Sequence, residues 1–264
     1  MDSNKRRIVA TVEYDGSRFL GWQRQLDDPT VQAELENALS RVANEPTKVT
    51  AAGRTDSGVH ACGQVIHFDS TQVRSGDNWL RGTNTLLPDG IAVLGVQEIS
   101  SEFNARYSAL SRSYRYVIFK RKMRPTYLQN YVTWDYRQLD PSAMHNAAQT
   151  LLGEHDFNAF RASSCQAKSA VREITSIQVN GSGNWVWIDI SANGFLHHMV
   201  RNIAGVLMAI GAGEKSAHWI KTILESKDRT QGGKTAPAQG LYLTKVNYTS
   251  EYRVPEPSEP CRFW

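Results

Sequence analysis

Residues 53–69, GRTDSGVHACGQVIHFD, place one carboxylate in a short polar turn that leads directly into an alternating apolar stretch. Asp56 is that carboxylate; the nearest acids along the chain are Glu45 and Asp69, and Arg54 stands two residues before it. An aspartate before Ser-Gly often forms a turn, because its side chain bonds nearby backbone amides. A carboxylate at the start of a strand can equally be a nucleophile that needs no metal. The local sequence leaves both interpretations open.

Residues 191–213, SANGFLHHMVRNIAGVLMAIGAG, contain a single formal charge, Arg201. Four apolar side chains at helical spacing predict a core helix here: Met199, Ile203, Val206 and Ile210. A guanidinium in such a helix needs an anionic partner or a route to water, since burying it unpaired is costly. Pairing with Asp56 would satisfy both groups and keep the carboxylate ionised and oriented. The alternative is an arginine that reaches solvent at the helix edge.

Basic residues gather in stretches without acids. Residues 103–134 hold no Asp or Glu but include Arg106, Arg112, Arg115, Lys120, Arg121, Lys122 and Arg124, and residues 157–172 carry Arg161 and Lys168. Such stretches can form positive surface patches that bind phosphates. The alternative is that these side chains are ordinary solvated charges on strands and loops. Tyr114 lies in the first stretch, either as core packing or as a platform that stacks on a nucleobase and offers its phenol for proton transfer.

Composition narrows the class of protein. The 264 residues are 41% hydrophobic and 21% charged with a net charge of +4, as expected for a globular protein of one large or two smaller domains. The three cysteines form no C-x-x-C pair, so neither a zinc ribbon nor a disulfide framework is predicted. No apolar run is long enough for a signal peptide or a membrane span, and we expect a cytoplasmic protein.

Other candidate sites fail on spacing. The segment GGKT at residues 232–235 resembles the end of a phosphate-binding loop, but Asp228 stands where that motif requires glycine. His197 and His198 are adjacent, and neighbouring side chains diverge by about 100° on a helix or about 180° on a strand, so we expect no shared metal. The zinc deaminase signature is absent from the sequence. The sequence therefore predicts neither a metal nor a cofactor.

Periodicity predicts a mixture of strands and helices. Expected strands are 7–14, 49–52, 64–68, 112–120, a hairpin over 172–192, and 240–247; expected helices are 31–43, 79–87, one from Pro141 to before Gly153, one after Asn193-Gly194 to about Gly211, and 217–226. Hairpins among mixed elements favour an α+β fold with a largely antiparallel sheet, and two similar halves would leave a cleft.

Several long blocks together resemble one family. They are VEYDGSRFLGWQRQ, GRTDSGVHACGQVIHF, FNARYSALSRSYRYVI, GEHDFNAFRASSCQAKSAVREI, NGFLHHMVRNIAGVL and APAQGLYL, and in this order they span most of residues 8–246. The chain resembles the tRNA pseudouridine synthase I family, whose members act on the anticodon arm. Ser57 departs from that family's more usual alanine, and the chain after Tyr248 matches nothing recognisable.

The resemblance implies roles for five residues. Asp56 would be the nucleophilic carboxylate and Arg201 the arginine that pairs with it. Tyr114 would stack on the target base and is a candidate base for the proton at C5. Arg54 would help to displace the target nucleotide, and Leu241 would line the uracil pocket.

The resemblance also implies the fold and the organisation of the chain. We expect two α/β halves that share a mainly antiparallel sheet, with helices on the outer side and a basic active-site cleft between the halves. Residues 1–108 would form the half with the Asp loop, residues 109–247 the half with the Tyr strand and the Arg helix, and residues 248–264 a loose Pro-rich tail. The resemblance also implies a homodimer.

The implied reaction isomerises uridine to pseudouridine at positions 38, 39 and 40 of the tRNA anticodon stem-loop, without a cofactor or a membrane. The uridine must leave the base stack, which costs a few kcal/mol that phosphate contacts could offset. Whether the aspartate attacks the sugar C1′ or the uracil ring stays open. One alternative is a non-catalytic RNA-binding or chaperone protein; another is a glycoside-type hydrolase, which would need a second acid near Asp56.

Overall fold

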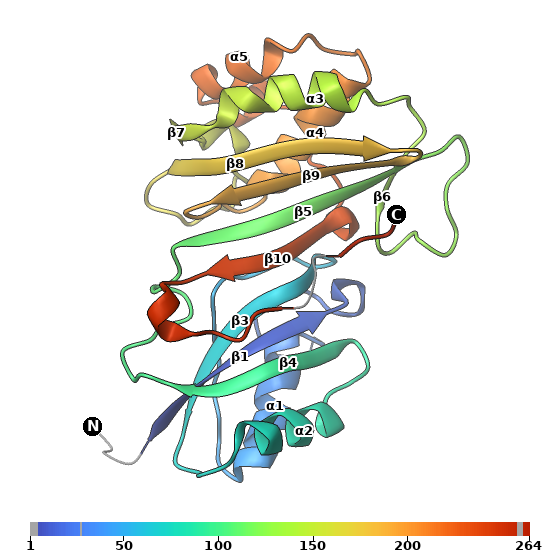
Figure 1. Ribbon diagram of the computed structural model, residues 1–264. Coiled ribbons are helices and arrows are strands. Elements are labelled where there is room, and N and C mark those ends of the chain that lie inside the picture. The colour runs from blue at the N-terminus through green and yellow to red at the C-terminus, as the bar shows by residue number, and fades with distance from the viewer. Residues whose placement is uncertain (1–4, 27, 258–260) are drawn as a thin grey trace. The chain divides into compact units, whose positions relative to one another are not determined.

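A computed structural model describes residues 5–26, 28–257 and 261–264. The chain divides into two compact units (Figure 1): the first comprises Met1–Leu110 and Tyr242–Cys261, and the second comprises Ser111–Leu241 and Arg262–Trp264. Within the described ranges, no helix combines the length and the apolar character that a membrane span requires.

The first unit is built on strands β1 (Arg6–Tyr14), β2 (Thr50–Ala51), β3 (His60–Ser70), β4 (Ile91–Ile99) and β10 (Leu241–Asn247), in the order β4-β1-β3-β10 with β2 against β3. β1 runs antiparallel to both neighbours, whereas β10 runs parallel to β3, with Tyr242 opposite His60. Helices α1 (Val31–Ala43) and α2 (Gly76–Leu86) pack together. The Trp79 ring of α2 meets Phe68 of β3 edge-on at 5.1 Å, which fixes α2 to the sheet.

The second unit is built on β5 (Ser111–Lys120), β6 (Thr133–Asp135), β7 (Gly153–Asp156), β8 (Val171–Ser182) and β9 (Trp185–Ala192), in the order β5-β9-β8-β7. These neighbours pair antiparallel, and the short β6 runs parallel to β5. Helices α3 (Pro141–Ala148), α4 (Met199–Gly211) and α5 (Trp219–Ser226) complete it, with α3 against β8 and α4 against β5. The alternating residues Val186, Ile188 and Ile190 of β9 are buried.

The observed elements confirm the α+β class with mainly antiparallel pairing. The helix predicted over residues 31–43 has those bounds, because Val31, Leu35 and Leu39 form one buried stripe. The helix predicted after Gly194 begins later, at Met199. The strands β4, β6 and β7 were not predicted, since their short or weakly alternating sequences give little periodic signal.

The chain after β10 differs from the expected division and from the expected loose tail. Residues 242–261 belong to the first unit, because β10 adds to β3 and the following segment packs back on β1 and β4. The Gln97 amide donates to the carbonyls of Tyr252 and Arg253 at 3.0 and 2.5 Å, and the Tyr248 and Tyr252 rings each lie 5.0 Å from Phe103. Because β3 and β10 are far apart in the sequence, their parallel pairing leaves no local pattern from which it could be predicted.

The last residues dock on the second unit. The Trp264 ring stacks on Trp187 at 4.0 Å with planes 22° apart, and the Arg115 guanidinium lies 5.5 Å from the Trp264 ring. Phe263 stacks on Trp185 at 5.9 Å. These contacts cover the side of β9 opposite to its buried aliphatic residues.

Candidate active site

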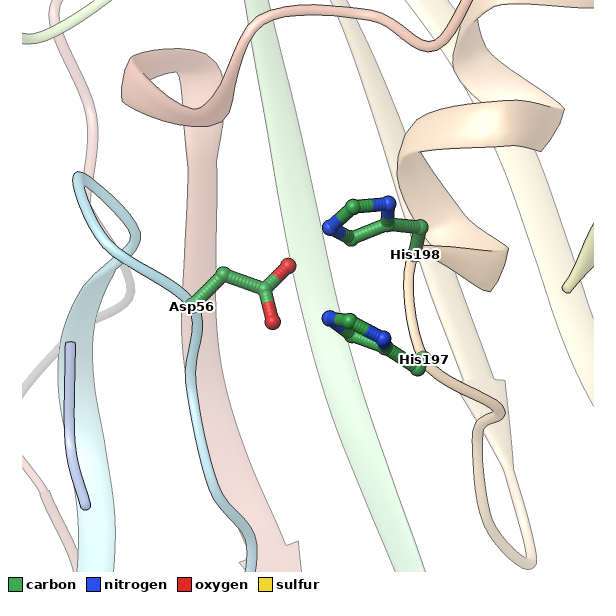
Figure 2. A group of neighbouring side chains, drawn as sticks. All are labelled: Asp56, His197 and His198. Atoms are coloured by element: carbon green, nitrogen blue, oxygen red, sulfur yellow. The ribbon is translucent and has the colours of Figure 1, made fainter. Parts of the chain in front are cut away.

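Asp56 lies in the loop that joins β2 to β3. Figure 2 shows its carboxylate extending from this loop, and the residue is half-buried. The Val59 amide donates to the Asp56 carbonyl at 3.1 Å, and Gly58 adopts a φ of +78°, a conformation that glycine accepts without strain. Asp56 therefore does sit in a tight turn, and this turn leaves its carboxylate partly accessible.

Contacts to both backbone and side chains hold this loop in place. The Thr55 hydroxyl bonds the Tyr14 hydroxyl at 2.7 Å, and the Thr55 carbonyl accepts from the Trp22 amide at 3.0 Å. The Gln64 side chain donates to the Gly53 carbonyl at 2.7 Å. Thr55 and Gln64 are buried, so these bonds form away from water and restrain the residue next to Asp56.

Two glycines let the residue 15–22 loop approach the Asp56 loop closely. A Cβ on Gly16 would lie 2.0 Å from the Val59 carbonyl oxygen. A Cβ on Gly21, whose φ is +89°, would lie 3.1 Å from the Thr55 carbonyl oxygen. The YDGSRFLGW block thus has a structural explanation: its glycines allow one loop to support the other.

His60 continues this support at the start of β3. Its Nδ1 accepts from the Gly16 amide at 3.0 Å and lies 3.4 Å from the Asp15 carboxylate. Its ring stacks on Tyr242 of β10 at 4.6 Å with planes 15° apart. Sequence reasoning assigned no role to His60, although it lies in the same block, four residues after Asp56. Arg54, on the other side of Asp56, is exposed.

Tyr114 and Tyr116 point to the same face of β5, since they are two residues apart. Tyr114 is half-buried, and its ring meets Phe195 edge-on at 5.1 Å. The Tyr116 hydroxyl is fully buried between the Thr133 hydroxyl at 2.5 Å and the Pro237 carbonyl at 2.8 Å, and burial raises the pKa of Tyr116 above its ordinary value. Tyr116 is therefore a structural residue, and Tyr114 is the more accessible of the two.

Arg201 lies in the first turn of α4 and is half-buried. Its Nε donates to the Ala236 carbonyl at 2.9 Å, and the Ala236 amide donates back to the Arg201 carbonyl at 3.1 Å. A Cβ on Gly205 would lie 1.9 Å from the Lys234 carbonyl oxygen, so glycine there lets residues 234–236 lie against the helix. The hydrogen bond to the Ala236 carbonyl therefore orients the Arg201 guanidinium. Its pairing with Asp56 remains a prediction.

A buried polar network under α4 was missed by sequence reasoning. Asn202, which is 2% exposed, donates to the Phe160 carbonyl at 2.6 Å and accepts from Thr235 at 2.7 Å and from Arg229 at 3.1 Å. Arg229 also donates to Thr235 at 3.0 Å. The GGKT segment therefore serves to pack against α4. The signal that could have found it was the polar Asn202 inside an apolar helix.

His197 and His198 lie on the segment just ahead of α4 (Figure 2). Their ring centroids are 4.0 Å apart, so the expectation that these side chains diverge is wrong. The reason is that His198 adopts a φ of +62°, which belongs to neither a helix nor a strand. Ser164 lies 3.2 Å from Nδ1 of His197.

Leu241, the fifth predicted site residue, is the first residue of β10 and is 6% exposed. The Gly240 before it allows a close approach, because a Cβ there would lie 2.5 Å from the Thr133 hydroxyl. An apolar side chain at this position is consistent with core packing. Its place in a uracil pocket stays a prediction.

Comparison with known proteins adds independent information. A family model described as tRNA pseudouridine synthase matches residues 10–108 and 147–249. These ranges include Asp56, Arg201 and Leu241 but not Tyr114.

Curated relatives match over nearly the whole chain. The tRNA pseudouridine synthase A of Nitrosococcus oceani is 50% identical over 98% of this chain and all of its own length. The tRNA pseudouridine synthase A of Pseudoalteromonas atlantica is 52% identical over 95% of each chain, and that of Coxiella burnetii is 49% identical over 94% of this chain and 95% of its own. The chain belongs to the tRNA pseudouridine synthase family, a family of isomerases that act on tRNA.

Proposed function

We propose that this protein isomerises uridine to pseudouridine at positions 38, 39 and 40 of the tRNA anticodon stem-loop, with Asp56 as the nucleophile. The observation that carries the proposal is the restrained Asp56 loop. Thr55 and Gly53 on one side and Val59 on the other are each held by hydrogen bonds, while the carboxylate between them is partly accessible. A nucleophile needs this combination of fixed position and access.

The proposed reaction conserves atoms and electrons. The C1′–N1 glycosidic bond breaks, the uracil turns, and C1′ forms a bond to C5; the proton at C5 leaves and N1 gains one. Asp56 would form a covalent bond in this sequence, either to C1′ or to the ring, and that bond breaks again to free the carboxylate when pseudouridine forms. Tyr114 is the proposed base for the C5 proton, because its phenol is more accessible than that of Tyr116.

Arg201, Arg54 and Leu241 complete the proposal. Arg201 would keep the Asp56 carboxylate ionised, and its Nε bond to the Ala236 carbonyl would fix the direction of its guanidinium. Arg54, which is exposed, would help to displace the target nucleotide. Leu241 would supply an apolar contact for uracil.

We further propose a homodimer that acts in the cytoplasm, where tRNA is modified. This part rests on the family resemblance. Light scattering of the purified protein would test it: a mass of one chain at micromolar concentration would contradict the dimer.

The test of the proposed specificity is to incubate the protein with unmodified tRNA transcripts and to map pseudouridine along each transcript. Product confined to positions 38–40 supports the proposal, and product elsewhere would redirect it. Free uracil in place of pseudouridine would favour the glycoside-type hydrolase. Binding without any product would favour the RNA-binding protein.

A further inference from the structure

The chain between β5 and the residue after β6 forms a surface that the proposed reaction does not use. We call Lys122, Met123, Arg124, Trp134 and Tyr136 the β5–β6 surface; all five side chains are exposed. They lie in residues 109–146, an internal stretch that the family model leaves unmatched. Figure 1 shows this segment as an extended loop that leaves β5 and returns through β6.

The backbone of this surface is organised by Arg121. Its Nε donates to the Met123 carbonyl at 2.8 Å, and its Nη2 donates to the Arg124 carbonyl at 2.9 Å. The Arg121 guanidinium therefore holds the turn by its backbone carbonyls, and the side chains of Lys122, Met123 and Arg124 stay exposed. The turn is also tied to β6, because the Trp134 indole donates to the Arg121 carbonyl at 2.6 Å.

The aromatic part of the surface is unusual in its exposure. Trp134 is 38% and Tyr136 68% exposed, although burying such rings is favourable. Their centroids are 6.3 Å apart and the ring planes are tilted by 51°. The indole bond to Arg121 fixes one ring, so the pair presents accessible aromatic faces beside the basic turn.

Basic side chains precede these rings in the sequence, and the acids close to them are hydrogen-bonded or ion-paired. Asp135, which separates the two rings in sequence, is 5% exposed, and both of its carboxylate oxygens accept from Arg137. Residues 103–134 contain no acid. The exposed acid nearest the rings in sequence, Asp140, accepts from the Ser142 and Ala143 amides at the start of α3. The exposed cations that precede the rings are Lys122 and Arg124, whose turn is held by the Arg121 guanidinium.

We propose that the β5–β6 surface binds unpaired nucleotides of the RNA substrate, with Trp134 and Tyr136 stacking on bases and Lys122 and Arg124 contacting the adjacent phosphates. Aromatic rings beside cations are the combination that recognises single-stranded RNA. A second copy of this chain fits less well, because a symmetric contact would bring each patch of positive charge against itself. The inference rests on the proposed function for its tRNA substrate.

The first test, of the phosphate contacts, measures tRNA binding as a function of salt concentration. Lys122→Gln/Arg124→Gln should weaken binding at least about tenfold and lower the slope of log K against log salt by about 1 per lost phosphate contact. The matched control is Lys215→Gln/Lys221→Gln, which removes two exposed charges at and near α5. An unchanged slope, or the same loss in the control, would overturn the proposal.

A second test, of base stacking, substitutes Tyr136. Tyr136→Ala should weaken binding of tRNA and of a single-stranded oligonucleotide by about tenfold and leave a fully paired RNA duplex unaffected. Tyr136→Phe keeps a ring and should bind as wild type does. Equal loss for duplex and single strand would contradict stacking on unpaired bases.

Two further readouts separate the possible failures. Light scattering that shows dissociation of a wild-type dimer in Tyr136→Ala would make this surface a contact between copies and overturn RNA binding there. In turnover, Lys122→Gln/Arg124→Gln should raise KM with kcat unchanged, because these residues lie outside the proposed chemistry. If the wild-type protein forms no pseudouridine, the proposed function fails, whereas the surface is judged by binding alone.

Discussion

The two units hold their candidate catalytic residues by different means. In the first unit, Asp56 stands on a loop that a second loop supports, and the close approach depends on Gly16 and Gly21. In the second, Arg201 stands on a core helix, against which residues 229–236 are held by the buried Asn202 network. A loop supported by a loop can adjust its carboxylate more easily than a packed helix can move its guanidinium. The position of Asp56 in the first unit therefore depends on the close fit of two backbone loops, and that of Arg201 in the second on buried hydrogen bonds.

The largest effect should come from filling either close backbone approach. Gly16→Ala and Gly205→Ala each place a Cβ about 2 Å from a carbonyl oxygen, of Val59 and of Lys234 respectively. Overpacking of this kind costs about 3 kcal/mol or more. Urea unfolding should show a loss of this size in both variants, with Gly213→Ala as a control where the Cβ would meet open space. Because Gly213 has a φ of +73°, its own cost reflects backbone strain alone.

The same glycine variants should loosen different parts of the two units. Hydrogen exchange in Gly16→Ala should increase at the Trp22 amide, which bonds one loop of the first unit to the other, and at the Val59 amide, which closes the Asp56 turn. In Gly205→Ala it should increase at Ala236. If exchange in either variant increased first at amides of the other unit, the contacts that hold Asp56 and those that hold Arg201 would not be independent.

Acid should weaken the first unit through His67 on β3. Burial, with a contribution from the Arg7 charge, lowers the pKa of His67 from 6.5 to about 4. Its Nδ1 accepts from the Ala105 amide at 3.0 Å, a bond that protonation removes. Because the folded pKa lies below the unfolded one, this stability is complete above pH 6.5 and is lost as the pH falls from 6.5 towards 4.

The expected loss over that window is about 3 kcal/mol, from a shift of about 2.5 pH units. Urea unfolding at several pH values measures it directly. His67→Gln, which keeps an acceptor but cannot gain a proton, should have a flatter profile over this window. An equally steep profile in that variant would assign the acid sensitivity to other groups.

The smaller effect belongs to the buried network of the second unit. Asn202→Ala leaves the Phe160 carbonyl and the Thr235 and Arg229 donors without their partner, at a cost of about 2 kcal/mol. Activity should fall through kcat, because the helix turn that carries Arg201 loses its fixed position. Thr222→Ala, on the exposed side of α5, is the control. Unchanged kcat with reduced stability would show that the network only packs the helix.

Much of the fold could be predicted from sequence, but its long-range contacts could not. The helix α1 was predicted because Val31, Leu35 and Leu39 repeat with helical spacing. The parallel addition of β10 to β3, and the contacts of residues 248–257, join segments distant in the chain and leave no periodic signal. The left-handed His198 likewise has no local cue, since glycine or asparagine usually occupies such positions.

The candidate site was predicted unevenly for the same reason. Asp56 and Arg201 stand out because each is an isolated charge beside apolar sequence. The residues that position them, such as Gln64, His60 and Asn202, act through tertiary hydrogen bonds. A single sequence shows the residue types but not which backbone groups they meet.

The central claim is that Asp56 is the nucleophile, and a single-turnover measurement tests it most directly. Unmodified tRNA labelled with tritium at C5 of uridine releases the label when C1′ joins C5. Asp56→Asn should release it at least about 10⁴-fold more slowly than wild type, as loss of a nucleophile does in other enzymes, with tRNA affinity nearly unchanged. The control Asp77→Asn, an exposed acid in α2, should react as wild type does. Release by Asp56→Asn at the wild-type rate would contradict the account.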